Sequence, residues 1–118
     1  PEIASAGMTE DQAKENGIAV KCGKFIMSAN GKSIITQEER GFIKVVADEA
    51  TGKILGAQMM CARATDMIGE FVTAITNGLT VEQMLKGMRS HPTYNEGIGE
   101  ALEELEGGAV HVVPRKKK

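Results

Sequence analysis

The chain has 118 residues, of which 42% are hydrophobic and 25% are charged, and its formal net charge is -2. This length and composition predict one globular domain with a single core. The longest apolar runs are only a few residues, so no segment can span a bilayer, and the stretch after Pro1 resembles neither a signal peptide nor a presequence. We therefore expect a soluble, cytoplasmic protein.

Charge and metal-ligating residues exclude two classes of function. Residues 115–118 hold four of the 14 basic side chains, so residues 1–114 carry 10 basic and 16 acidic groups. This acidic body lacks the basic stripe of a nucleic-acid-binding domain. Cys22 and Cys61 stand 39 residues apart without a C-x-x-C pattern, and the chain has two histidines. We expect buried thiols and no metal site.

The N-terminal part of the chain predicts two strands around a short helix. Residues 3–8 form a strand candidate, and Thr9–Gln12 is a capping box that begins a helix. This helix should end at Asn16–Gly17, a pair suited to the left-handed position after a helix. Residues 18–27 are rich in branched and aromatic side chains and predict the second strand. We expect Asn30–Gly31 to close that strand with a turn.

The next two strand candidates, 42–47 and 54–61, are joined by the polar loop 48–53 and predict an antiparallel hairpin. Apolar residues occur on both alternating faces of these strands, which predicts a hairpin covered on both sides. Helices of this chain could supply one layer. A partner subunit or another domain could supply the other.

Three helical patterns complete the chain. The first has apolar residues at positions 64, 67, 68, 71, 72, 75 and 79 and should stop at Asn77–Gly78. A second capping box, Thr80–Gln83, begins a shorter helix that runs through Met88.

The third pattern places four glutamates on one helix face and four apolar residues on the opposite face. The apolar residues are Ile98, Ala101, Leu102 and Leu105. Gly107–Gly108 should end this helix, and we expect residues 109–118 to be a mobile tail. The order of elements predicts an α+β fold, in which an antiparallel β-sheet has helices packed against it.

A histidine and a carboxylate, His91 and Glu96, stand five residues apart with Pro92 between them. Proline favours an extended residue before it and is tolerated at a helix start, so the two side chains can meet. A carboxylate beside an imidazole prepares it as a base for a thiol or hydroxyl. However, Thr93-x-x-Glu96 is also a capping box, which would give Glu96 a purely structural role. The spacing leaves both interpretations open.

Several separate motifs occur in the order found in one known family. They are Pro1–Ala4, Gly7–Glu10, Ser28–Gly31, Gly41–Lys44, Thr51–Gly56 and His91–Thr93 followed by Glu96. With these motifs the chain resembles the C-terminal dimerisation domain of the FAD-dependent pyridine nucleotide-disulfide oxidoreductases, and within that family it is most similar to the dihydrolipoyl dehydrogenases. The resemblance divides the chain into a dimerisation domain, residues 1–106, and a C-terminal tail, residues 107–118.

The resemblance implies a homodimeric flavoenzyme that passes electrons from dihydrolipoamide through a cysteine disulfide and FAD to NAD, and that serves a 2-oxo acid dehydrogenase complex. In the family, the histidine of this motif enters the active site of the other subunit. His91 would then be the acid/base for the substrate thiol, and Glu96 would orient it. By the same analogy the backbone carbonyl of His91 would approach the flavin of the partner subunit, and the His91–Pro92 bond would be cis.

Two departures from the family pattern leave the disulfide substrate open. Arg89 stands where lipoamide enzymes commonly have another histidine, and Tyr94–Asn95 replaces leucine and serine. The roles implied for His91 and Glu96 are unaffected. The substrate could be lipoamide or, in a glutathione reductase-like enzyme, another disulfide.

The chain lacks other parts that such an enzyme needs. It has no G-x-G-x-x-G motif for FAD or NAD and no closely spaced cysteine pair. We therefore expect the isolated chain to be inactive, to bind no cofactor, and to work with the FAD- and NAD-binding domains of a full-length enzyme. The first residue is not methionine, which fits a fragment or a processed chain. The alternative is a free-standing, non-catalytic dimerisation module, which the coding sequence upstream of Pro1 would distinguish.

Overall fold

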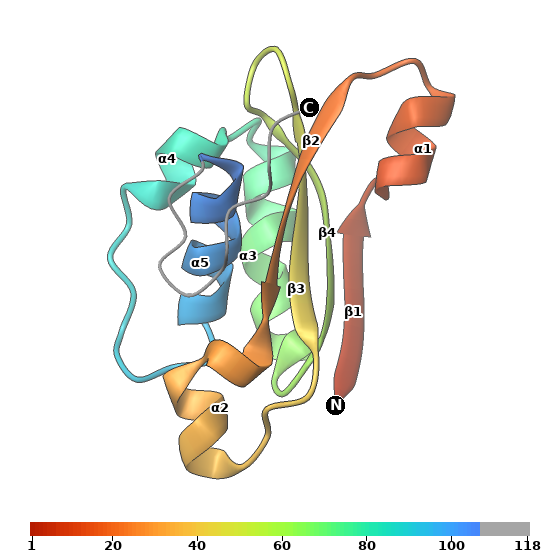
Figure 1. The fold of residues 1–118 in the computed structure, drawn as a ribbon. Helices are drawn as coiled ribbons and strands as arrows, with labels where there is room; N and C mark the ends of the chain where they lie inside the picture. Colours follow the sequence, from red (N-terminus) through yellow and green to blue (C-terminus); the bar gives the residue numbers. More distant parts are fainter. Residues whose placement is uncertain (107–118) are drawn as a thin grey trace.

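The computed structural model describes residues 1–106, and within them it confirms the α+β fold (Figure 1). Four antiparallel strands form one sheet in the order β1-β4-β3-β2. The strands are β1 (Glu2–Gly7), β2 (Val20–Ile26), β3 (Phe42–Asp48) and β4 (Ile54–Cys61). The helices are α1 (Glu10–Glu15), α2 (Gly31–Thr36), α3 (Ala64–Thr76), α4 (Val81–Leu85) and α5 (Glu96–Leu105), with a 3-10 turn at Met27–Ala29. The predicted mobile tail, residues 107–118, lies outside the described residues.

The core lies between the sheet and the layer formed by α3 and α5. Alternate residues of β3, such as Ile43 and Val45, are fully buried on this side. They pack in one cluster with Phe71 of α3 and Leu102 of α5. Each such side chain contributes roughly 1.5–3 kcal/mol when buried. The predicted hairpin of β3 and β4 is therefore the centre of the domain.

On the second face of the sheet, the described residues cover one end and leave the other end exposed. There the segment leading into α1 crosses Gly56, and Val46 beside it is fully buried. At the other end one cross-strand row, Ile3, Met60, Phe42 and Ile26, runs across all four strands. Ile3 is 75% exposed and Ile26 is 48% exposed. The prediction of a hairpin covered on both sides holds within residues 1–106 for part of its length.

The turn predicted at Asn30–Gly31 was wrong, because Asn30 begins helix α2. Its Oδ1 atom accepts hydrogen bonds from the backbone N–H and the hydroxyl of Ser33, both at 2.9 Å. Asn30 is 4% exposed and Ser33 is fully buried. An Asn-Gly pair is common both in turns and at helix starts. Here the buried hydrogen bonds between Asn30 and Ser33 favour the helix start.

Two apolar residues do not lie where the helical pattern placed them. Val72 of α3 is 51% exposed, whereas Ala74 is buried, because Val72 stands at the edge of the apolar stripe and the sheet covers the other side. The helix predicted to run through Met88 ends at Leu85, and Met88 is fully exposed. The capping boxes at Thr9 and Thr80 are both confirmed.

Candidate functional site

The loop 86–95 carries His91 from the end of α4 to the start of α5, where Glu96 is the first helical residue. The His91–Pro92 peptide bond is cis, as the family resemblance implied. Nδ1 of His91 lies 2.9 Å from Oε1 and 3.0 Å from Oε2 of Glu96. The structure therefore brings together the two residues that the spacing singled out.

The same carboxylate also closes the capping box. The backbone N–H of Thr93 donates to Oε1 of Glu96 at 3.0 Å, and the backbone N–H of Glu96 donates to Oγ1 of Thr93 at 3.3 Å. The catalytic and the capping interpretations are thus compatible. Glu96 is fixed at the helix start by its cap, and this position directs its carboxylate at the imidazole.

The exposure of the pair allows acid/base chemistry. The His91 side chain is 78% exposed and that of Glu96 is 32% exposed. A carboxylate that accepts at Nδ1 keeps the proton of the neutral ring on that atom. Nε2, on the far side of the ring, is then free to take a proton from an incoming group.

Contacts from α2 hold the loop in place from one side. The side-chain amide of Asn30 donates to the carbonyl of Thr93 at 2.9 Å. The hydroxyl of Tyr94 lies 2.6 Å from Oγ1 of Thr36 and donates to Glu38 at 2.9 Å. Sequence reasoning missed these residues, because they stand about 60 positions from their partners and no local pattern marks them.

Arg89 holds the loop from the other side, through α3. Its guanidinium donates from Nη1 and Nη2 to the two oxygens of Glu70, at 2.8 and 2.7 Å, and from Nη1 to Oδ1 of Asn95 at 2.6 Å. Burial by itself would raise the pKa of Glu70, but the hydrogen bonds and charge of Arg89, with a hydrogen bond from Asn95, hold that pKa below its ordinary value. Glu70 is therefore ionised at neutral pH. Sequence analysis singled out Arg89 and Asn95 only as departures from the family pattern, and no local pattern connects them to Glu70.

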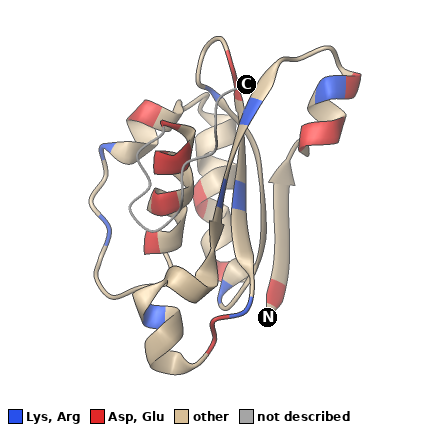
Figure 2. Ribbon diagram, viewed as in Figure 1, with Lys and Arg blue, Asp and Glu red and all other residues tan. Residues whose placement is uncertain are grey.

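A cavity of about 510 Å³ opens beside His91. Its apolar wall is formed by Phe25, Ala29 and Ile34, and its lining also includes Asn30, Gly31, His91, Glu96 and Glu100. No lysine or arginine is among these described residues. Acidic residues gather along α5, which forms one side of the cavity (Figure 2).

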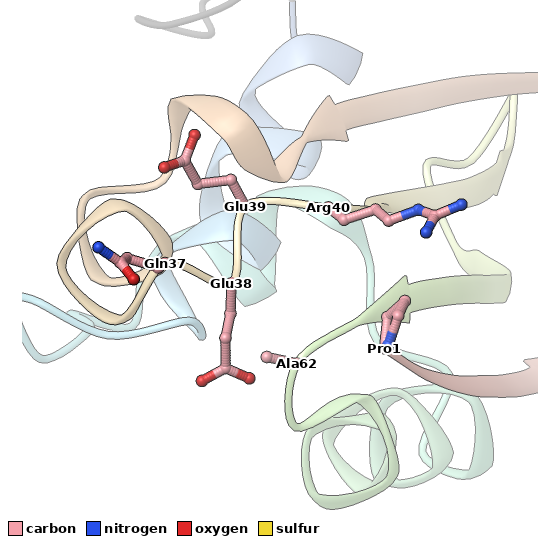
Figure 3. A pocket seen from close by; sticks show the side chains of 6 residues that line it. All are labelled: Pro1, Gln37, Glu38, Glu39, Arg40 and Ala62. Atoms are coloured by element: carbon pink, nitrogen blue, oxygen red, sulfur yellow. The ribbon is translucent and has the colours of Figure 1, made fainter.

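A second hollow, of about 230 Å³, lies between Pro1, Ala62 and residues 37–40 (Figure 3). Its charged side chains are Glu38, Glu39 and Arg40. It contains neither a histidine nor a thiol, so it does not repeat the histidine–carboxylate arrangement found at His91.

The two cysteines are unsuited to redox chemistry within this chain. Cys61 is fully buried and Cys22 is partly buried. Burial raises the pKa of the Cys61 thiol to about 11, and burial together with Glu10 raises that of Cys22. Strand β3 separates β2 from β4, which puts the two Cα atoms roughly 10 Å or more apart, beyond the approximately 7 Å limit for a disulfide.

Residues 1–106 contain no group of side chains that could hold a metal ion. In the same part of the chain, no helix is long and apolar enough to cross a membrane.

Comparison with known sequences identifies relatives over nearly the whole chain. A family model described as "Pyridine nucleotide-disulphide oxidoreductase, dimerisation domain" matches residues 1–102. Two dihydrolipoyl dehydrogenases of Bacillus subtilis (strain 168) are 41% and 45% identical to the chain, over 96% and 94% of its length. A dihydrolipoyl dehydrogenase of Haloferax volcanii is 39% identical over 98% of the chain. The chain spans only 24%, 23% and 24% of these three relatives.

Solved structures share the fold. LpdA from Mycobacterium tuberculosis matches with a TM-score of 0.83 at 23% identity, over 89% of this chain and 23% of that one. The HOCl-induced flavoprotein disulfide reductase RclA from Escherichia coli matches with a TM-score of 0.81 at 25% identity, over 86% and 23%. In both, the similar part is about a quarter of a longer protein.

Proposed function

Since the chain belongs to the family of pyridine nucleotide-disulphide oxidoreductase dimerisation domains, we propose that it joins two subunits of a dihydrolipoyl dehydrogenase-like enzyme and supplies His91 and Glu96 to the active site of the partner subunit. The observation that carries this proposal is the contact of both Glu96 oxygens with Nδ1 of a ring that is 78% exposed. The exposed ring leaves His91 accessible to a substrate held in another domain.

In the proposed reaction, Nε2 of His91 takes the proton of one substrate thiol as that sulfur attacks a disulfide held in another domain. This forms a mixed disulfide between substrate and enzyme, and one enzyme thiolate leaves. The second substrate thiol then attacks the substrate sulfur of the mixed disulfide, which closes the substrate disulfide and releases the other enzyme thiolate. The two substrate protons end on the enzyme, one of them taken up by His91. The substrate dithiol becomes a disulfide, and the enzyme disulfide becomes a dithiol, so two electrons are transferred. In the neutral ring Glu96 holds the proton on Nδ1, which leaves Nε2 to accept the thiol proton, and it stabilises the imidazolium that forms.

The described residues do not fit a bound dinucleotide. Their sheet is antiparallel throughout, and no glycine-rich loop joins a strand to a helix. We therefore assign FAD and NAD to the other domains of the full-length enzyme, where they would accept the two electrons. The backbone carbonyl of His91 is proposed to approach the flavin of the partner subunit, and the isolated chain is expected to be inactive.

The cavity beside His91 supports a lipoyl substrate over glutathione. Glutathione carries two carboxylates, which a site normally binds with arginine or lysine. The described lining of this cavity contains Glu96 and Glu100 and an apolar wall that includes Phe25 and Ile34. This lining suits the uncharged, apolar arm of a lipoyl group. Arg89, the departure from the family pattern, is bound to Glu70 and does not line this cavity.

The test is single-turnover flavin reduction by a dithiol in the full-length enzyme, followed by stopped flow. His91→Gln should slow this step by about 10²- to 10⁴-fold, the usual contribution of a positioned acid/base. Glu96→Gln should slow it less, because the amide can still accept from Thr93 but would donate to Nδ1 and so favour the wrong tautomer. An unchanged rate in His91→Gln would refute the catalytic proposal.

Thr93→Ala is the matched control for the cap. It removes the hydroxyl that accepts from the Glu96 N–H but keeps the Thr93 N–H that holds the carboxylate. We expect a loss of about 1 kcal/mol in stability, with flavin reduction retained in folded enzyme. Normal flavin reduction in Glu96→Gln would show that the carboxylate is only a helix cap.

A further inference from the structure

We propose that Arg89 is a positioning residue that holds the start of α5 so that the Glu96 carboxylate faces Nδ1 of His91. This inference rests on the proposed function of the pair. It concerns a network of three residues, Glu70, Arg89 and Asn95, none of which touches the imidazole itself in the described contacts.

The hydrogen bonds of the network form a closed set. Arg89 binds both Glu70 oxygens and Oδ1 of Asn95, and the Asn95 amide donates back to Oε1 of Glu70 at 3.2 Å. The Arg89 side chain is only 14% exposed. A guanidinium fork that binds a carboxylate with two parallel hydrogen bonds fixes orientation as well as distance. The loop is therefore attached to α3 at a defined point.

This attachment point is rigid. Glu70 directly precedes Phe71, which is fully buried in the core between α3 and the sheet. Arg89 also lies against α5 at Gly99, where an added Cβ would stand 3.3 Å from both Cδ and Nε of the arginine. The absence of a side chain at Gly99 lets the arginine stem pack on the helix. Arg89 thus contacts one helix through its charge and the other through its stem.

Asn95 carries the effect to the catalytic pair. It occupies the position before the first residue of α5, Glu96, yet its side chain makes no capping hydrogen bond to the helix. Instead the Asn95 side chain accepts a hydrogen bond from Arg89 and donates one to Glu70. On the other side, Asn30 holds Thr93. Glu96 is therefore placed by two anchors, α2 through Thr93 and α3 through Asn95.

The direct test measures which nitrogen of neutral His91 carries the proton. Long-range proton–nitrogen NMR correlations of the ¹⁵N-labelled 118-residue chain report this tautomer at alkaline pH, where the ring is neutral. A His91→Gln spectrum assigns the signals, because the chain has one other histidine. We expect the proton on Nδ1 in the unaltered chain, and a shift toward the mixture of a free imidazole in Arg89→Leu and in Arg89→Lys, which loses the two-point contact.

Asn95→Ala separates positioning from stability, because it keeps the Arg89–Glu70 pair and removes only the connection to Glu96. It should shift the tautomer as well. Arg40→Lys makes the same exchange of side chain at an exposed arginine outside this network and should change nothing. An unchanged tautomer in folded Asn95→Ala and Arg89→Lys would overturn the proposal.

The full-length enzyme supplies a second, independent readout. Asn95→Ala should slow flavin reduction by about tenfold, since small misplacements of a catalytic group cost up to about 10²-fold. In a Glu96→Gln background Asn95→Ala should not slow flavin reduction further. If the two substitutions slowed the reaction independently, Asn95 would not act through Glu96. A normal rate in His91→Gln would instead refute the proposed function, while the tautomer result for Arg89 and Asn95 would stand.

Discussion

A single carboxylate serves both the helix and the imidazole at Glu96. Its Oε1 atom accepts from the Thr93 N–H and contacts Nδ1 of His91, and Oε2 contacts the same ring nitrogen. The cap restricts the rotamers of the glutamate before any substrate arrives. Pre-organisation of this kind is what allows a base to act without first paying for its own ordering.

The Glu70 carboxylate makes acid stability sensitive to one ion pair. Because its pKa is lowered in the folded chain, the unfolded chain binds more protons between the folded value and the ordinary value of 4.5. The stability from this group is therefore complete above pH 4.5 and is lost as the pH falls through the lower, folded pKa.

Glu70→Gln tests this. At pH 7 it should lower the free energy of unfolding by about 1–3 kcal/mol, since Arg89 is left without its charged partner. The difference in free energy of unfolding between this variant and the unaltered chain should become smaller as the pH falls below 4.5. Urea unfolding at a series of pH values measures this difference. Glu15→Gln, at an exposed residue of α1, is the control and should track the unaltered chain. A constant gap for Glu70→Gln across the pH range would contradict the ionised pair.

Helix α5 approaches the sheet unusually closely at strand β2. A Cβ on Gly23 would overlap the carbonyl oxygen of Ala101, so only glycine lets the two backbones meet there. One turn away, Oε2 of Glu104 accepts from the backbone N–H of Lys24 at 2.7 Å. β2 is an edge strand, and this side chain occupies one of its free donors, which protects the edge against pairing with other chains.

Gly23→Ala should therefore destabilise the domain by roughly 1–3 kcal/mol or more, because backbone atoms cannot move aside as a flexible side chain can. Gly69→Ala is the matched control on α3, where nothing lies within 4 Å of an added Cβ. It should stabilise the chain by about 0.4–1 kcal/mol through reduced entropy of the unfolded state. Thermal and urea unfolding would measure both, and equal effects of the two substitutions would contradict the close approach.

The domain as a whole presents apolar surface that its own described residues leave uncovered. Val72 on α3 is 51% exposed and Ile3 on the second sheet face is 75% exposed. Met88, which is fully exposed, adds to this surface, whereas Met27 and Met59 are buried in the core. The contiguous row that runs from Ile3 to Ile26 on the second sheet face is the kind of apolar surface that an interface covers, in agreement with the proposed dimer.

We predict that the 118-residue chain self-associates mainly through its helices and is colourless after gel filtration. In sedimentation velocity experiments, Val72→Lys should weaken the dimer more than Ile3→Lys, because the first adds a charge to a helix face and the second to the sheet. A strict monomer at high concentration would show that the interface needs the other domains. Flavin retained by the purified chain would contradict the assignment of FAD to those domains.

The sequence by itself determined the features that depend on near neighbours. The capping boxes at Thr9 and Thr80 and the β3–β4 hairpin follow from patterns a few residues long, and the structure has all three. The contact between His91 and Glu96 spans five residues, so spacing and a proline indicated that the two side chains could meet, although they left the role of Glu96 open. Local hydrogen bonds of this kind form wherever the backbone takes the conformation that its own residues favour.

Only the tertiary structure decided which distant groups meet. The Arg89–Glu70 pair spans 19 positions, and the Asn30–Thr93 contact spans 63. The buried side of α3, which leaves Val72 outside, was also set by the sheet. These contacts depend on strand register and on how α3 and α5 pack on the sheet, which no local pattern encodes. The pair at the proposed active site is thus local in sequence, whereas the anchors that hold it in place come from the fold.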